Sequence, residues 1–235
     1  MSNAAAITTN SPTITQWFDT GDSRQIKIDH NFCSTKEKSL HPHEHLFVAG
    51  DAQSQVYQIL EGVVGIYELL ADGRRQIATF CYPGDLIGLD HLQSFANSAE
   101  ALCSARVRCI PLNTMDRLIS TEPGFGQALL QVLSTELAET RDQLLSLGRK
   151  SAYEKVATFL LRIARRNQRE GKNENDLYLP MRRSEIADYL GLTIETVSRN
   201  ITKLKVARAI RLVSKNRIEV LDMNLLEDCA ECSTH

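Results

Sequence analysis

Residues 181–204 read Met181-Arg-Arg-Ser-Glu-Ile-Ala-Asp-Tyr-Leu-Gly-Leu-Thr-Ile-Glu-Thr-Val-Ser-Arg-Asn-Ile-Thr-Lys-Leu204, and this segment has the layout of a helix-turn-helix motif. Ser184 can cap a short first helix, and Gly191 supplies the left-handed residue that ends it. Thr193 can cap a second helix. Helical spacing predicts that the apolar residues of both helices face the core: Ile186, Ala187, Leu190, Val197, Ile201 and Leu204.

The outer face of the second helix carries three polar side chains near its N-terminus: Glu195, Ser198 and Arg199. In this motif, that end of the helix enters the major groove. An Arg can grip O6 and N7 of guanine, and a carboxylate can accept from N4 of cytosine. Because a carboxylate repels the DNA backbone, Glu195 indicates that this helix reads bases and does not only bind phosphates. Glu195 and Arg199 are spaced i, i+4, so the carboxylate can also hold the Arg199 side chain in position. The alternative is a surface salt bridge on a packing helix.

A wing is predicted after the motif. Residues 210–221 read as two strands around a turn at Ser214–Asn216, with basic residues around them that could contact phosphates without specifying sequence: Lys203, Lys205, Arg208, Arg211, Lys215 and Arg217. We assign contacts with the DNA backbone to Arg183, Thr193, Thr196, Lys203 and Lys215.

A coiled-coil seam is predicted further upstream. Residues spaced alternately by three and four positions form an a/d pattern over about three heptads: Leu130, Leu133, Leu137, Thr140, Leu144 and Leu147. Charged flanking residues favour pairing of two copies; the alternative is a helix packed on its own domain. A hinge at Gly148–Ser151, an amphipathic helix over Tyr153–Ala164 and a polar linker at Gly171–Asp176 follow.

The first half of the chain has the pattern of a β domain. Short β-rich runs occur at Val56–Leu60, Val63–Tyr67 and Gln76–Phe80, and Asp72-Gly73 is a strong hairpin signal. Ala105–Cys109 alternates with period two. Many short strands with regular turns predict a sandwich, jelly roll or small barrel.

Composition and charge narrow the functional class. The 235 residues are 43% hydrophobic and 24% charged, which excludes disordered and fibrous chains. Ser151–Asp222 holds fifteen Lys and Arg against nine Asp and Glu, whereas residues 1–150 hold twelve against seventeen, which fits polyanion binding by the C-terminal part. There is neither a signal-peptide pattern nor an uncharged run of about 18 residues. We therefore expect a cytoplasmic protein without membrane contact, whose six cysteines are reduced.

Over roughly residues 36–228, the sequence resembles the CRP/FNR superfamily of bacterial transcription regulators, most of all its FNR and FixK branch. The β region contributes Leu46-Phe-Val-Ala-Gly-Asp51, Asp72-Gly-Arg-Arg-Gln-Ile77 and Pro83-Gly-Asp-Leu-Ile-Gly88. The most specific string is Tyr189-Leu-Gly-Leu-Thr-Ile-Glu-Thr-Val-Ser-Arg199. The resemblance implies an α+β fold: an N-terminal double-stranded β-helix (a jelly roll like those that bind cyclic nucleotides), a long dimerisation helix and a C-terminal winged helix-turn-helix.

These patterns divide the chain into five parts. We expect a flexible N-terminal segment at 1–35, a β-roll sensor-like domain at 36–112, and a dimerisation helix region at 113–150. The winged helix-turn-helix DNA-binding domain covers 151–228, and a tail covers 229–235.

The resemblance also implies partners. In the family, the residues matching Glu195, Ser198 and Arg199 read a TTGA-type half-site, a homodimer reads the inverted repeat, and activation involves contact with RNA polymerase. The expected partners are therefore double-stranded DNA, a second copy of this chain and RNA polymerase. The chain has no phosphate-cradling glycine loop and no nucleophile elbow, so we assign no catalytic residue and expect no enzyme.

Three positions depart from the family pattern. Asn97-Ser98 replaces the Arg-Ser pair that grips the phosphate of cyclic AMP. The N-terminal part offers Cys33 alone where oxygen sensors have several cysteines, and Cys109 falls one residue past the matching position, which reverses its face on a strand. We therefore expect neither cyclic AMP nor an iron–sulfur cluster, and no cofactor. Arg208 stands where the family usually has glycine after the recognition helix.

Lacking both sensing sites, the chain looks like the FixK type, in which an upstream regulator sets the abundance of the protein. This implies an activator of low-oxygen respiration and nitrogen-fixation genes. One alternative is a sensor-regulator of the same family gated by haem, a metal or a metabolite through His41–His45 or Cys33. A more distant one is a cupin-like metal enzyme tethered to a DNA-binding tail.

Two further groups have metal-like spacing. His41-Pro-His-Glu-His45 places three histidines on alternate positions, which would share one face if the segment were extended. The metal-binding motif of cupins also needs a glutamate after the second histidine, and this glutamate is missing here. We therefore favour a solvated turn. Cys229-Ala-Glu-Cys232 lies in an acidic, frayed tail without a second C-x-x-C. We assign no metal-binding residue.

Overall fold

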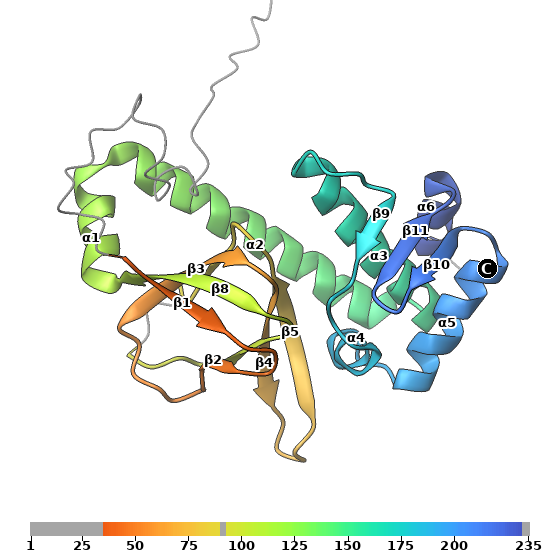
Figure 1. Ribbon diagram of the computed structural model, residues 1–235, viewed down its shortest axis with the longest axis horizontal. Coiled ribbons are helices and arrows are strands. Elements are labelled where there is room, and N and C mark those ends of the chain that lie inside the picture. Colours follow the sequence, from red (N-terminus) through yellow and green to blue (C-terminus); the bar gives the residue numbers. More distant parts are fainter. Residues whose placement is uncertain (1–34, 90–92, 232–235) are drawn as a thin grey trace, which may run out of the picture.

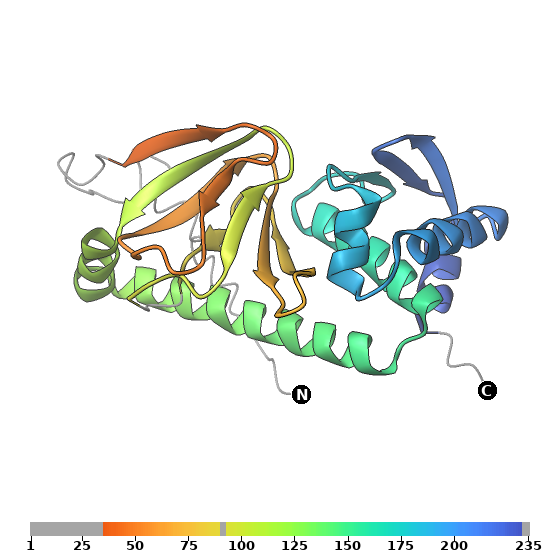
Figure 2. The same cartoon turned by 90° about the horizontal axis from the view of Figure 1, so that it is seen from below.

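The computed structural model describes residues 35–89 and 93–231. A β-roll lies at one end, a domain of helices with a small sheet lies at the other, and a long helix runs along the roll toward this C-terminal domain (Figures 1 and 2). None of the helices in these residues is long and apolar enough to cross a bilayer.

Within the described residues, the roll consists of two antiparallel four-stranded sheets. Their orders are β1-β8-β3-β6 and β2-β7-β4-β5. The strands are β1 Lys36–Leu40, β2 His45–Phe47, β3 Gln55–Glu61, β4 Val64–Leu69, β5 Arg75–Cys81, β6 Leu86–Ile87, β7 Ser98–Ala101 and β8 Ala105–Pro111.

The roll confirms the predicted jelly-roll-like fold and the hairpin. Gly73 has a φ of +81° in the turn that joins β4 to β5, a conformation that glycine adopts without the steric cost of a Cβ. Buried apolar residues from both sheets, including Phe47, Ile59, Val64 and Val107, form the core between them.

Helices and a small sheet make up the rest of the described chain. These elements are α1 Leu112–Thr121, α2 Pro123–Arg149, α3 Ala152–Arg169, β9 Asp176–Tyr178, α4 Arg183–Leu190, α5 Ile194–Val206, β10 Ile210–Ser214, β11 Arg217–Val220 and α6 Met223–Glu231. The break between α2 and α3 falls at the predicted hinge. Ser151 caps α3 there, because its backbone N–H donates to the Glu154 carboxylate and its hydroxyl accepts from the Glu154 N–H.

In the C-terminal part, one strand was not predicted and one sequence-based interpretation is wrong. The polar linker ends in β9, which pairs with β11 and adds a third strand to the wing. Cys229 does not lie in a frayed tail: it is buried in α6, with its Sγ 3.1 Å from the Tyr153 hydroxyl. Leu226, Cys229 and Ala230 are spaced i, i+3, i+4 and form the buried face of that helix. Cys232 and Cys33 lie outside the described residues.

The two domains share one hydrophobic core. Phe80 of the roll packs against Phe159 and Tyr189 of the C-terminal domain, with a centroid distance of 4.9 Å to the Tyr189 ring. Polar contacts surround this core. The Gln76 side chain donates to the Asp188 carbonyl, and Arg75 lies 3.8 Å from the Asp188 carboxylate. The C-terminal domain is therefore docked on the roll of its own chain.

The end of α5 contains a strained residue. Arg208 has a φ of +62°, and the Ala209 N–H donates to the Leu204 carbonyl at 3.1 Å, which is the Schellman arrangement. A left-handed conformation costs a non-glycine residue about 1–2 kcal/mol. Arg208 thus replaces the glycine that the family usually has at this position, although the turn keeps a left-handed geometry that suits glycine.

We expect Arg208→Gly to raise the free energy of unfolding by about 0.5–1 kcal/mol, since relief of strain exceeds the entropic cost of glycine. Chemical denaturation measures this change. Lys205→Gly, inside α5, is the matched control and should lower stability by about 1 kcal/mol. A loss of stability in Arg208→Gly would contradict the argument.

Candidate nucleic-acid interface

The helix-turn-helix is formed by α4, a tight turn and α5. Gly191 has a φ of +62°, and the six apolar residues predicted to face inward are all buried, which confirms both predictions. The predicted cap Ser184 is wrong, because α4 begins at Arg183. The Arg182 N–H donates instead to the buried carboxylate of Glu185, so the cap depends on a main-chain donor that any residue except proline could supply.

Thr193 caps α5 as predicted. Its Oγ1 accepts from the Thr196 N–H at 3.2 Å and lies 3.0 Å from the Thr196 hydroxyl. Thr193 is exposed and Thr196 is half-buried at the first turn of the helix. Both of these predicted phosphate contacts therefore lie beside the backbone N–H groups that a helix N-terminus offers to an anion.

The three predicted base-reading side chains are all exposed on α5. Hydrogen bonds from the backbone N–H of Glu195 itself and from the Thr193 hydroxyl hold the pKa of the Glu195 carboxyl below its usual range, and Arg199 contributes a smaller attraction. In the described part of the chain, no ion pair within 4 Å joins Glu195 to Arg199. The groups at the start of α5 therefore lower the pKa of this carboxyl more than Arg199 does, whereas we expected Arg199 to be its main partner.

The basic residues of the wing fall into two groups. Arg211 donates to Glu219 and Arg217 donates to Asp176, each from Nε at 2.6 Å. Lys203 and Lys215 are exposed and have no carboxylate within 4 Å among the described residues. The two lysines therefore fit phosphate contacts better than the two paired arginines.

Two details at the interface were not predicted. The sequence did not reveal that Asp176 neutralises Arg217, because this contact exists only when β9 pairs with β11. Arg183, a predicted phosphate contact, is half-buried, and burial lowers its pKa.

We expect Lys215→Ala to weaken DNA binding almost equally for all sequences and to reduce the slope of log K against log salt by about 0.9 per bound subunit, the value for one phosphate contact. Titrations at several salt concentrations measure the slope. The matched control is Arg217→Ala, which should leave the slope nearly unchanged because Asp176 already neutralises that side chain. A smaller slope for Arg217→Ala than for Lys215→Ala would contradict this assignment.

The predicted seam lies along α2. Leu130 and Leu144 are each 66% exposed; Leu133, Leu137 and Thr140 are also exposed, and Leu147 is half-buried near Gly191. The Thr140 hydroxyl donates to the Glu136 carbonyl at 2.8 Å, so burial of this side chain would not leave its donor unsatisfied. Apolar side chains at five of the six positions thus share a stripe that is largely uncovered in the single chain.

The histidine segment forms the exposed turn that the sequence favoured, and the alternative of an extended segment with three histidines on one face is wrong. The chain turns at His43, whose φ is +67°, and the histidines have different partners. His43 Nδ1 lies 2.7 Å from Glu100, and His45 Nε2 lies 2.7 Å from the Tyr67 hydroxyl. Residues 35–89 and 93–231 contain no group of three His, Cys, Asp or Glu side chains that could hold a metal ion.

Cys109 faces the interior of the roll, where it packs against the core. The preceding Arg108 lies on the other face of β8 and donates to Gln58 at 2.8 Å. This confirms the predicted reversal of face between the two positions.

Comparison with known proteins agrees with this arrangement. Residues 37–122 match the cyclic nucleotide-binding domain, and residues 154–229 match the Crp-like helix-turn-helix domain. The nitrogen fixation regulation protein FixK of Azorhizobium caulinodans is 39% identical over 182 residues, which cover 76% of this chain and 73% of that protein. The chain belongs to the CRP/FNR family.

Further relatives support the FixK and FNR-like branch. The transcriptional activator protein FnrL of Cereibacter sphaeroides is 35% identical over 79% of this chain and 77% of its own length. The structure of FixK2 from Bradyrhizobium japonicum aligns with a TM-score of 0.77 and 34% identity over 83% of this chain and 96% of that one. The chain is thus a FixK/FNR-like transcription regulator with a helix-turn-helix DNA-binding domain, and it is not an enzyme.

Proposed function

We propose that two copies of this chain bind a TTGA-type inverted repeat and activate genes of low-oxygen respiration or nitrogen fixation. The observation that carries the proposal is the exposed set Glu195, Ser198 and Arg199 at the start of α5. The helix offers an acceptor and a guanidinium side by side, which are the groups needed to read a cytosine N4 and a guanine edge.

The homodimer is supported by the exposed stripe on α2, because a twofold dimer places two recognition helices on the two halves of an inverted repeat. The physiological role is supported by the relatives, which are called nitrogen fixation regulation proteins and an activator protein. Activation further requires contact with RNA polymerase, which we include in the proposal on the ground of this kinship.

The test is binding of the purified full chain to a duplex with the TTGA inverted repeat and to a scrambled duplex of the same composition, at one salt concentration. We expect one dimer to bind tightly to the inverted repeat and much more weakly to the scrambled duplex. Footprinting on genomic DNA would then identify the promoters. Equal affinity for both duplexes would overturn the proposal.

Absorbance spectra and metal analysis of protein purified without oxygen test the assignment of no cofactor. We expect a colourless, metal-free dimer. A haem or iron–sulfur spectrum would favour a sensor that binds its own cofactor.

A further inference from the structure

A cavity of about 850 Å³ lies between α2, α3 and strand β5 of the roll. This volume is in the range of sites for small molecules. Phe80, Leu145 and Phe159 contribute apolar wall. Six cationic side chains also line the cavity, against two carboxylates, those of Glu139 and Asp142: the cations are Arg149, Lys150, Arg162, Arg165, Arg166 and Arg169.

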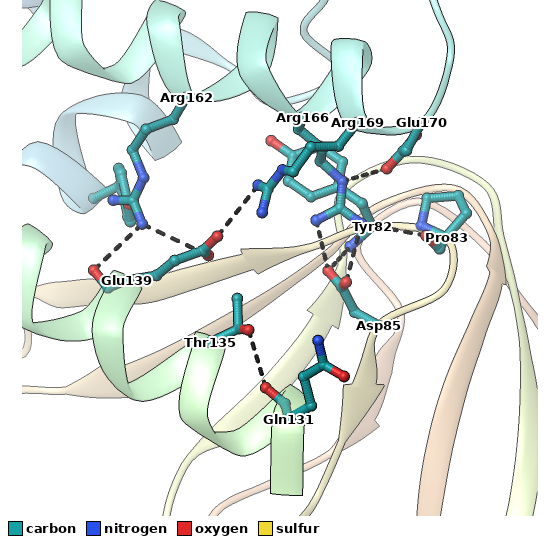
Figure 3. Close-up of polar contacts among 11 residues, drawn as sticks. Tyr82, Pro83, Asp85, Gln131, Thr135, Glu139, Arg162, Arg166, Arg169 and Glu170 are labelled. Atoms are coloured by element: carbon teal, nitrogen blue, oxygen red, sulfur yellow. Dashed lines mark hydrogen bonds and ion pairs between the residues drawn. The ribbon is translucent and has the colours of Figure 1, made fainter. Parts of the chain in front are cut away.

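Three of these arginines extend from α3 toward α2 and the roll (Figure 3). The Glu139 carboxylate lies 3.3 Å from Arg169 and 3.9 Å from Arg162. One negative group from α2 therefore already occupies a position between two guanidinium groups. Such forks suit the oxygens of carboxylates and phosphates.

Arg166 also lines the cavity, but it is already paired. It contacts Asp85 at 3.0 Å and Glu170 at 2.6 Å, and its guanidinium lies 4.5 Å from the centre of the Tyr82 ring. These contacts fix the position of α3 against the roll. The other cationic side chains of the cavity can therefore bind an anionic ligand.

The cations nearest the hinge are not neutralised. Among the described residues, Arg149 and Lys150 have no carboxylate within 4 Å, and the Lys150 ammonium donates to the neutral Thr158 hydroxyl at 2.7 Å. Arg165 pairs with Glu227, which does not line the cavity. The wall thus carries excess positive charge, from the exposed side chains of Arg149 and Arg169 and from the half-buried Lys150.

The cavity is separate from the predicted dimer seam. The positions of α2 that line it, such as Glu139, Asp142 and Ser146, recur at helical spacing on the side of the helix opposite Leu137 and Leu144. Pairing of two copies through the seam would therefore leave it accessible. None of the residues assigned to DNA contact lines it.

We propose that this cavity binds a small molecule carrying two or more phosphate groups. Arg149, Lys150 and Arg169 supply the contacts from both sides of the hinge, and Arg162 completes the site when it exchanges Glu139 for a phosphate oxygen. A bound molecule would join the dimerisation helix to the first helix of the DNA-binding domain.

Isothermal titration calorimetry on the full chain tests this, with ATP, inorganic triphosphate and citrate as probes at constant ionic strength. We expect one site per chain for ATP, and an at least tenfold loss of affinity in the Arg149→Gln/Arg169→Gln variant, since one ionic hydrogen bond is worth about a factor of ten or more. If inorganic triphosphate binds as tightly as ATP, the phosphate groups alone account for the affinity. If triphosphate binds more weakly than ATP, the apolar wall of the cavity also contacts the nucleoside.

Two matched variants separate this site from other basic surfaces. Arg74→Gln, on the exposed turn between β4 and β5, removes a cation elsewhere and should leave binding unchanged. Glu139→Gln should tighten binding several-fold because it removes the competing carboxylate, and an unfolded protein would not show such a gain.

Several outcomes would overturn the proposal. The first is the absence of saturable binding by the wild-type chain. Equal affinity for citrate would rule out selection for phosphate. Binding that survives in the double arginine variant but is lost in Lys203→Gln/Lys215→Gln would place the anion on the DNA-contacting face.

Discussion

Replacing Arg199 with alanine is expected to weaken binding to the TTGA inverted repeat by about 1–3 kcal/mol per half-site, the typical value of one bidentate contact with a base. The side chain is exposed, so its truncation should leave the core of α5 intact. Affinity for random DNA should change little. Fluorescence anisotropy with both duplexes at one salt concentration measures the two affinities, and the salt must be fixed because it alone changes them by orders of magnitude.

Arg199→Lys distinguishes base reading from charge. Lysine keeps the positive charge but lacks the planar fork that meets O6 and N7 together. We expect it to recover only part of the specific affinity. Full recovery, or an alanine variant that loses affinity equally on both duplexes, would mean that Arg199 contacts only a phosphate.

The helix-turn-helix could be predicted from the sequence because its determinants are local. Val197, Ile201 and Leu204 repeat with the period of a helix, Gly191 adopts the left-handed turn, and Thr193 bonds a main-chain N–H three residues away. Each of these signals operates within one or two turns of chain. The same locality allowed the Asp72-Gly73 hairpin to be predicted.

Features that depend on distant partners could not be predicted. Strand β9 is only three residues long and forms because β11 pairs with it. The buried face of α6 was hidden among acidic residues, and it becomes evident only when α3 is seen to cover it. Docking of the roll on the DNA-binding domain depends on Phe80 meeting Phe159 and Tyr189 across some eighty to one hundred and nine positions of sequence.

Competition between local partners explains the smaller errors. Glu195 can interact with Arg199 one turn later or with the donors at the helix start, and the start offers its own N–H and the Thr193 hydroxyl. At α4, Ser184 is a good capping residue, but Glu185 reaches the N–H of Arg182 and the helix begins two residues earlier than a Ser184 cap would place it. The residue types alone do not decide between such neighbouring alternatives.

The seam on α2 leads to the second large effect. We expect Leu137→Glu/Leu144→Glu to convert the dimer to monomers, because four leucines per dimer would be lost from an apolar stripe and replaced by charges. Burial of one leucine contributes about 1.5–3 kcal/mol, so roughly 6–12 kcal/mol of association energy would be removed. Sedimentation velocity at micromolar concentration measures the oligomeric state.

The matched control is Ala138→Glu/Leu145→Glu, which adds the same charges at exposed positions one residue later. Each residue of a helix advances by about 100°, so these positions lie more than a quarter turn away from the seam. The control should stay dimeric and bind the inverted repeat, while the seam variant should lose cooperative binding to both half-sites. A seam variant that sediments as a dimer would mean that two copies meet through another surface, and the spacing of Leu130, Leu137 and Leu144 would then reflect some other packing of α2.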